Sequence, residues 1–207
     1  MKPEQHPRPA VGAVIFDLDG TLTRPYLDFD VIRREIGLPT QPRTPILEAL
    51  VTMSAEARAA AEAILHRYEE EAATACELQD GALEVVEAVR DRGIPVGLLT
   101  RNSRRSVETV LAQHAFAFDI VYTREDGPVK PSPEPILAMC RKLGVRPESS
   151  YVVGDYLFDL QSGNAAGATT VLMIGDASAP PFADQADHVI RCLRDLLPLI
   201  TRVTDHG

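Results

Sequence analysis

Six short apolar runs, separated by longer polar or amphipathic stretches, most constrain what this 207-residue chain can fold into. The runs cover residues 11–16, 94–100, 118–123, 150–155, 169–174 and, more weakly, 186–190. Short apolar runs that alternate with helices of about 10 to 13 residues indicate βαβ units, whose crossovers are right-handed. The sequence therefore predicts an α/β fold with a doubly wound, Rossmann-like parallel sheet.

Helix-capping residues mark where the intervening helices begin and end. The expected helices run from Asp80 to about Arg92, from Asn102 or Ser103 to Gln113, and from Ser132 to Gly144.

Residues 24–78 interrupt this alternation, since they contain two or three helical segments and no convincing strand. The last of these helices is alanine-rich, and its Glu69, Glu70 and Glu71 are expected to face solvent. The predicted domains are an α/β core of residues 1–23 and 79–207 and a small α-helical cap of residues 24–78, inserted after the first strand.

Composition and charge exclude several classes of function. With 30 acidic and 21 basic residues the net charge is −9, which repels a phosphate backbone, so no nucleic acid is expected as partner. The three cysteines are scattered and indicate neither a disulfide framework nor a zinc site. No signal pattern and no apolar run of about 20 residues is present, so we expect no membrane association and a cytoplasmic monomer or homodimer.

Polar side chains gather where the predicted strands end, which is the edge at which open α/β sheets bind ligands. They are Asp17 and Asp19 after the first strand, Thr100, Arg101 and Asn102 after the second, Lys130 after the third, and Asp155 and Asp159 after the fourth.

Each of these residues, taken alone, has a simpler explanation. Asp17 and Asp19 could form only an acidic turn, and Thr100 could simply be the end of a β-branched strand. Lys130 could be a solvated loop charge, and Asp155 could cap the helix that follows it. Four such coincidences at four strand ends are improbable together, so a shared site is the better interpretation.

One chemistry accounts for the whole set. Crowded carboxylates raise one another's pKa unless a cation neutralises them, so Asp17, Asp155 and Asp159 indicate a hard divalent ion, for which Mg²⁺ is the natural choice. A carboxylate in such a site can attack a phosphoryl group, while a second acid two residues along protonates the leaving oxygen and later activates water. Thr100 and Lys130 would hold and neutralise the phosphoryl oxygens.

Four motifs in order, FDLDGTL (16–22), LLTRNS (98–103), VKPSPEP (129–135) and VVGDYLFD (152–159), resemble those of the haloacid dehalogenase-like hydrolase superfamily. The similarity is to its phosphoglycolate phosphatase-like members, which carry a helical cap between the first two motifs. It implies Asp17 as nucleophile, Asp19 as general acid/base, and Thr100 and Lys130 as phosphate-binding groups. It also implies Mg²⁺ held by Asp17, Asp155 and the backbone carbonyl of Asp19, with Asp159 as a supporting acid.

The chain departs from the family pattern at Arg101, because many relatives place the asparagine directly after the hydroxyl residue. Either Arg101 or Asn102 is therefore expected to reach the substrate, together with Thr100 and Lys130. Arg24, at the start of the insert, is a further guanidinium expected to bind an anionic group of the substrate.

The expected activity is hydrolysis of small phosphorylated metabolites through an aspartyl-phosphate on Asp17. A phosphomutase of the same superfamily is the alternative, since it would use the same Asp17 and Asp19. A non-catalytic phospho-acceptor is a further alternative, but both Asp19 and the helical insert argue against it.

Overall fold

The computed structural model describes residues 11–201, which form two compact units. The core unit comprises residues 11–24, 77–101 and 115–201, and the helical unit comprises residues 25–76 and 102–114. No helix within 11–201 combines the length and the apolar character that crossing a bilayer requires.

A single parallel sheet of six strands forms the centre of the core unit, in the order β3-β2-β1-β4-β5-β6. The strands are β1 (Ala13–Phe16), β2 (Val96–Leu99), β3 (Ile120–Tyr122), β4 (Ser150–Gly154), β5 (Thr169–Met173) and β6 (His188–Ile190). All six predicted runs are strands, and the predicted α/β fold is confirmed. The runs are continuously apolar because the inner strands are buried on both faces, as β1, β2 and β4 are along their whole length.

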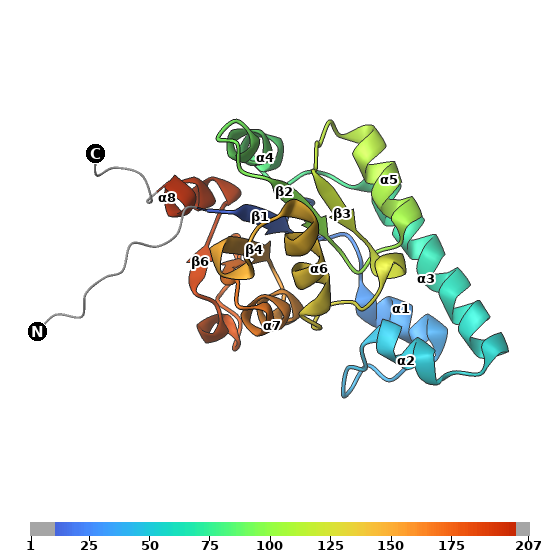
Figure 1. The fold of residues 1–207 in the computed structure, drawn as a ribbon. Helices are drawn as coiled ribbons and strands as arrows, with labels where there is room; N and C mark the ends of the chain where they lie inside the picture. The colour runs from blue at the N-terminus through green and yellow to red at the C-terminus, as the bar shows by residue number, and fades with distance from the viewer. Residues whose placement is uncertain (1–10, 202–207) are drawn as a thin grey trace, which may run out of the picture. The chain divides into compact units, whose positions relative to one another are not determined.

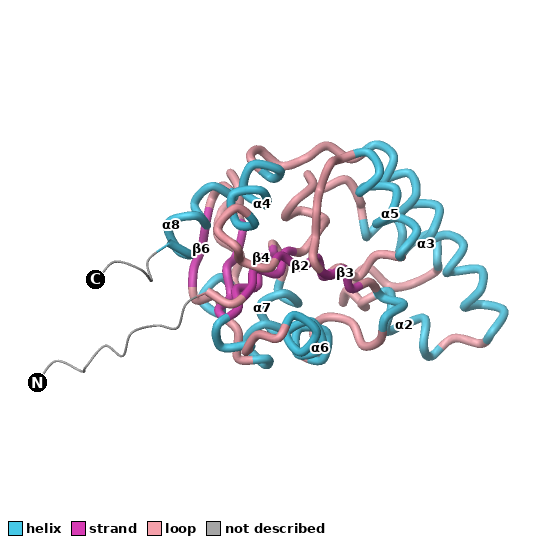
Figure 2. The backbone as a smooth tube through the Cα atoms, turned by 45° about the horizontal axis from the view of Figure 1, so that its top comes forward, coloured by secondary structure: helices cyan, strands magenta, loops and turns pink. Residues whose placement is uncertain are grey.

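Helices cover both faces of this sheet (Figures 1 and 2). The α-helices of the core unit are α4 (Ala82–Arg90), α6 (Glu134–Leu143), α7 (Leu157–Ala166) and α8 (Leu196–Thr201). Helices α6 and α7 pack together on one face, and α4 and α8 pack together on the other. Short 3₁₀ helices lie at Arg124–Asp126, Pro147–Ser149, Ala183–Gln185 and Leu193–Asp195.

The helical unit consists of α1 (Phe29–Ile36), α2 (Ile46–Thr52), α3 (Ala55–Ala75) and α5 (Arg104–Gln113). It has a small hydrophobic core of its own, which includes Ile32, Leu50 and Leu65. Helix α5 runs beside α3 in both views, and the two helices are in contact (Figures 1 and 2).

This packing differs from the sequence-based division, which assigned residues 102–114 to the α/β core. The contacts that join α5 to α3 include an ion pair of 3.0 Å between Arg105 and Glu70, and a hydrogen bond from Gln113 to the carbonyl of Thr74. Glu69 lies on the same face of α3 as the buried Leu65 and Ala72 and is only 4% exposed, so its predicted position in solvent is wrong.

The expected start of α5 and the expected end of α6 are observed, whereas the N-cap of α6 is Pro133 and not Ser132. Ser103 accepts a hydrogen bond from the Ser106 N–H as the N-cap of α5, and Gly144 ends α6 with a left-handed φ of 70°. Asp80 was the wrong choice as the cap of α4, which begins after Gly81. The Asp80 carboxylate instead accepts a hydrogen bond from Arg24 at 3.0 Å.

Candidate active site

The three central strands of the sheet end next to one another and carry the polar residues that the sequence singled out. Asp17 follows β1, Thr100 follows β2, and Asp155 follows β4. The Asp17 N–H donates to the Val153 carbonyl of β4 at 2.9 Å, and the Thr100 N–H donates to the Tyr122 carbonyl of β3 at 3.0 Å. The sheet ladder therefore fixes the backbone directly at both residues.

Lys130 links these strand ends through its ammonium group. Its Nζ lies 2.5 Å from Asp17 Oδ1, 2.6 Å from Asp159 Oδ1 and 3.1 Å from the Leu99 carbonyl. Because an ammonium has three N–H donors, these acceptors use all of them. Lys130 is only 3% exposed, so its charge is held inside the protein by two carboxylates.

Asp17, Asp155 and Asp159 form a cluster, with one carboxylate oxygen from each lying within 4.8 Å of the others. Asp159 is 2% exposed, and both of its oxygens accept hydrogen bonds, Oδ1 from Lys130 and Oδ2 from the Tyr156 N–H at 3.1 Å. Asp159 is thus suited to hold Lys130 and the start of α7, which leaves Asp17 and Asp155 better placed to bind a cation.

Burial raises the pKa of Asp17 well above its ordinary value; Lys130 lowers it, and the negative charges of Asp159 and Asp155 raise it further. Burial, followed by the charge of Asp159, raises the pKa of Asp155 to about 7. Burial lowers the pKa of Lys130, but the charges of Asp159 and Asp17 outweigh this effect and raise it above its usual range.

The pKa values of Asp17 and Asp155 are raised first by burial and then by an excess of negative charge around them. The single ammonium of Lys130 does not balance Asp17, Asp155 and Asp159, and Asp19 adds to the field at Asp155. Asp17, Asp155 and Asp159 offer a cation only carboxylate oxygens, the ligand type preferred by Mg²⁺. The cluster therefore fits a small divalent cation, which would allow all of the carboxylates to ionise.

Asp19 lies in a tight loop that Gly20 makes possible. Gly20 has a φ of 81°, and a Cβ at this position would lie 2.3 Å from Asp155 Oδ2, so only glycine fits. Asp19 Oδ1 accepts a long hydrogen bond of 3.5 Å from Thr23 Oγ1, and Thr21 Oγ1 donates to Asp155 Oδ1 at 3.4 Å. The loop is therefore packed directly against the carboxylate of Asp155.

Gln79 also holds this loop, and the sequence analysis missed it. Its side-chain Nε2 donates to the Gly20 carbonyl at 3.2 Å, and its backbone N–H donates to the Leu22 carbonyl at 2.9 Å. An isolated bridge pairs Thr23 with Leu78 in the same place. No motif marks Gln79, because it lies far from Gly20 in sequence and meets it only where the chain returns from the insert.

Gly154 is a second position where the site requires glycine. A Cβ there would lie 2.1 Å from Asp159 Cγ, which is far too close for two non-bonded carbon atoms. The small residue before Asp155 thus makes room for the carboxylate that holds Lys130.

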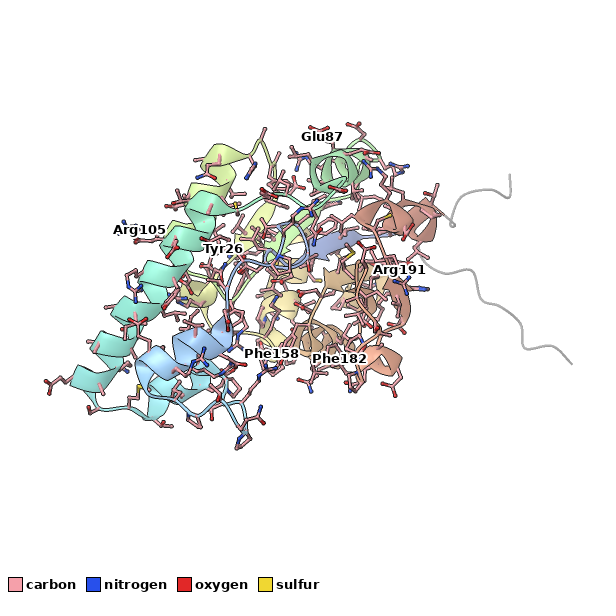
Figure 3. The ribbon with its side chains drawn as sticks, turned by 180° about the vertical axis from the view of Figure 1, so that it is seen from behind. Tyr26, Glu87, Arg105, Phe158, Phe182 and Arg191 are labelled. Carbon is pink, nitrogen blue, oxygen red and sulfur yellow. The ribbon has the colours of Figure 1, made fainter. Side chains whose placement is uncertain are left out.

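Arg101 belongs to the same set of contacts. Its Nη1 donates a hydrogen bond to the Lys130 carbonyl, and its guanidinium carbon lies 4.7 Å from the centre of the Phe158 ring. The Phe158 ring in turn lies edge-on to Tyr156, with centroids 5.2 Å apart, and Tyr156 packs against Phe182 at 5.8 Å. Figure 3 shows Phe158 and Phe182 close to each other on the core unit.

The remaining two residues predicted to bind substrate are placed differently. Arg24 is about half exposed and pairs with Asp80 at 3.0 Å and with Glu77 at 3.8 Å. Asn102 is part of the helical unit. Substrate binding by Arg24 and Asn102 remains a prediction from the sequence.

Comparison with known proteins places these features in a family. Residues 11–167 match the family model of the haloacid dehalogenase-like hydrolases. An uncharacterized hydrolase of Saccharomyces cerevisiae is 31% identical over 197 residues, covering 92% of this chain and 89% of that protein. The N-acetylmuramic acid 6-phosphate phosphatase of Pseudomonas aeruginosa is 28% identical over 215 residues, covering 92% and 95% of the two chains.

The fold is also shared with solved structures. A predicted phosphoglycolate phosphatase from Haemophilus somnus superposes with a TM-score of 0.69 at 20% identity, covering 91% of this chain and 97% of that one. At this identity the likeness concerns the fold. The family match spans all the strand ends that carry the carboxylates and Lys130. As its motifs predict, the chain is an enzyme that belongs to the haloacid dehalogenase-like hydrolase family.

Proposed function

We propose that this hydrolase is a Mg²⁺-dependent phosphatase that cleaves phosphate monoesters of small metabolites through an aspartyl-phosphate on Asp17. The observation that carries the proposal is the buried contact of Lys130 with Asp17 and Asp159 beside the carboxylate of Asp155. It combines a carboxylate nucleophile, a fixed positive charge and oxygen ligands for a cation at one sheet edge. The relative in Pseudomonas aeruginosa that is a sugar-phosphate phosphatase supports the same class of substrate.

The metal would be held by the carboxylates of Asp17 and Asp155 and by the backbone carbonyl of Asp19. When bound, Mg²⁺ supplies positive charge that neutralises the phosphoryl oxygens. Asp159 is already occupied by Lys130 and by the Tyr156 N–H, so its role is to keep Lys130 in position.

In the first step the Asp17 carboxylate attacks phosphorus, and the bond from phosphorus to the leaving oxygen breaks. Asp19 gives its proton to that oxygen, so that the alcohol leaves neutral. Lys130 donates to Asp17 Oδ1 and thereby fixes the orientation of the nucleophile. Thr100, which is nearly buried, provides a donor for the transferred phosphoryl group, and the positive charge of Lys130 offsets the negative charge that develops on it.

In the second step water attacks the phosphorus of the aspartyl-phosphate, and Asp19, now ionised, accepts a proton from this water. The bond between phosphorus and the Asp17 oxygen breaks, which releases inorganic phosphate and restores the Asp17 carboxylate. A long hydrogen bond and an isolated bridge to Thr23 hold Asp19 in its loop, from which it would serve both steps.

The test is phosphate release from a panel of small phosphorylated metabolites, with and without Mg²⁺. Asp17→Asn, which keeps the size of the side chain, is the control protein. We expect release that requires the metal and is lost in Asp17→Asn, and we expect borohydride to trap the phosphorylated carboxyl at residue 17. Activity of the variant near the parental level, or turnover indifferent to Mg²⁺, would refute the proposal. Conversion between isomeric sugar phosphates with little phosphate release would identify a mutase instead.

A further inference from the structure

We infer that Arg101 is a positioning residue, which holds Lys130 in its catalytic place rather than binding the substrate. The inference rests on the proposed function, because it takes Lys130 to be part of the catalytic machinery. From the sequence alone, the position of Arg101 directly after Thr100 favours contact with an anionic group of the substrate. The structure favours a different role.

The first support is a pair of contacts that attach Lys130 to the end of β2. Arg101 Nη1 donates to the backbone carbonyl of Lys130, and the Lys130 ammonium donates back to the Leu99 carbonyl at 3.1 Å. The backbone carbonyl and the ammonium of Lys130 are therefore both hydrogen-bonded to residues 99–101, at the end of β2. A long flexible side chain fixed at only one of these points would keep more of its rotamer freedom.

The second support is the contact of Arg101 with Phe158, which precedes Asp159 in the chain. The guanidinium lies over the Phe158 ring at 4.7 Å, and Asp159 holds the Lys130 ammonium at 2.6 Å. The contacts thus close a ring from Arg101 to Lys130, from Lys130 to Asp159, and from Phe158 back to Arg101. Movement of Arg101 would disturb two sides of this ring together.

The aromatic ring under Arg101 is itself held in place. Tyr156 packs edge-on against Phe158, and Phe182 packs against Tyr156 in turn. A planar guanidinium can stack on such a ring and donate a hydrogen bond sideways at once, which a lysine ammonium cannot do in the same geometry. The site therefore uses properties specific to arginine.

The two roles for Arg101 predict different kinetics. If Arg101 acts through Lys130, its loss should lower kcat for every substrate, including p-nitrophenyl phosphate, which has a single anionic group. If Arg101 binds the substrate, its loss should raise KM, and only for substrates that carry a second anionic group.

The experiment compares Arg101→Ala, Arg101→Lys and Phe158→Leu with the parental enzyme. The matched control is Arg194→Ala, which removes an exposed arginine paired with Glu84 on the surface of the core unit. We expect Arg101→Ala to lower kcat at least tenfold with KM changed less than threefold. The factor should be the same for substrates with one anionic group and for substrates with two. Arg101→Lys should not restore kcat, Phe158→Leu should lower it severalfold, and Arg194→Ala should leave it unchanged.

An Arg101→Ala enzyme with parental kcat, or one whose KM rises only for substrates with a second anion, would overturn the inference. So would a Phe158→Leu enzyme with parental kcat. If Arg101→Ala fails to fold by circular dichroism, Arg101→Lys and Phe158→Leu decide the question. Asp17→Asn, measured alongside, separates the two ideas: an active Asp17→Asn removes the proposed function, whereas an inactive Asp17→Asn beside a fully active Arg101→Ala removes only the positioning role.

Discussion

The ammonium of Lys130 lies 2.5 Å from the carboxylate of Asp17, and the side chains of the two residues are only 4% and 12% exposed. Removing one partner of such a buried ion pair destabilises the folded protein, because the remaining charge then has neither water nor a counter-ion. The pair therefore serves stability as well as chemistry, and each role can be measured.

Replacing Lys130 by methionine, which has a similar shape and no charge, should lower the free energy of unfolding by about 3 kcal/mol or more at neutral pH. Asp17 would lose its partner, so the loss should be smaller at acid pH, where Asp17 binds a proton. Denaturant titration measures the effect. The exposed Lys142, replaced in the same way, should change stability by no more than about 0.5 kcal/mol. Equal stability of the two variants would mean that the buried contact is not formed.

Gly20→Ala should abolish most activity, because the added Cβ would displace the Asp155 carboxylate. Gly144 provides a matched comparison, since it has a similar positive φ and no atom within 4 Å of the place that a Cβ would take. Both substitutions should cost about 1–2 kcal/mol for the left-handed backbone. Only Gly20→Ala should also raise the Mg²⁺ concentration needed for activity. Full activity of Gly20→Ala would show that Asp155 can move without consequence.

The stability of the metal-free protein should fall as pH rises from about 4 to 8. Asp155 has a folded-state pKa of about 7, above its unfolded value, so its contribution is fully present below the unfolded pKa and is lost as pH rises through the folded one. The raised pKa of Asp17 acts in the same direction, whereas the raised pKa of Lys130 acts only above neutral pH.

Thermal melting across this pH range, with and without Mg²⁺, measures the effect. The expected loss is of the order of a few kcal/mol, and both Asp155→Asn and saturating Mg²⁺ should reduce the slope. Stability that rises between pH 5 and 8 in the absence of metal would contradict the assignment of a strained carboxylate cluster.

Gln79→Leu should lower activity severalfold, because the Gly20 carbonyl loses its hydrogen bond and the loop that carries Asp19 loosens. The loss in unfolding free energy should be about 1 kcal/mol, the value typical of one hydrogen bond. Gln161→Leu, at an exposed position of α7, is the comparison and should behave as the parent. If both variants retain parental kcat, Gln79 has no part in positioning Asp19.

Much of the fold could be predicted because a parallel sheet covered on both faces leaves a direct trace in the sequence. Strands β1, β2 and β4 are wholly buried, so each appears as an unbroken apolar run. The positions of Asp17 and Asp155 follow from the same rule, since parallel strands end at a common edge.

Other features depend on contacts between distant segments, which no local pattern encodes. Glu69 precedes two further glutamates of a charged stretch in the sequence, but it is buried in the structure. Asp80 has the residue type of a helix cap, but its carboxylate accepts a hydrogen bond from Arg24. The contact between Arg101 and Phe158 depends on the meeting of the loop after β2 with the first turn of α7. Side chains that position others are therefore harder to identify from sequence than those in motifs.

The grouping of residues 102–114 with residues 25–76 affects the design of chimeras in which the helical unit is exchanged between related proteins. The helical unit is made of two separate pieces, and the chain passes between units at 24–25, 76–77, 101–102 and 114–115. A chimera that imports only the contiguous insert would put a foreign helix against the native α5, whose Val107 and Val110 are buried. The transferable module is therefore discontinuous, and swaps that move both pieces together should give folded hybrids more often than swaps of the insert alone.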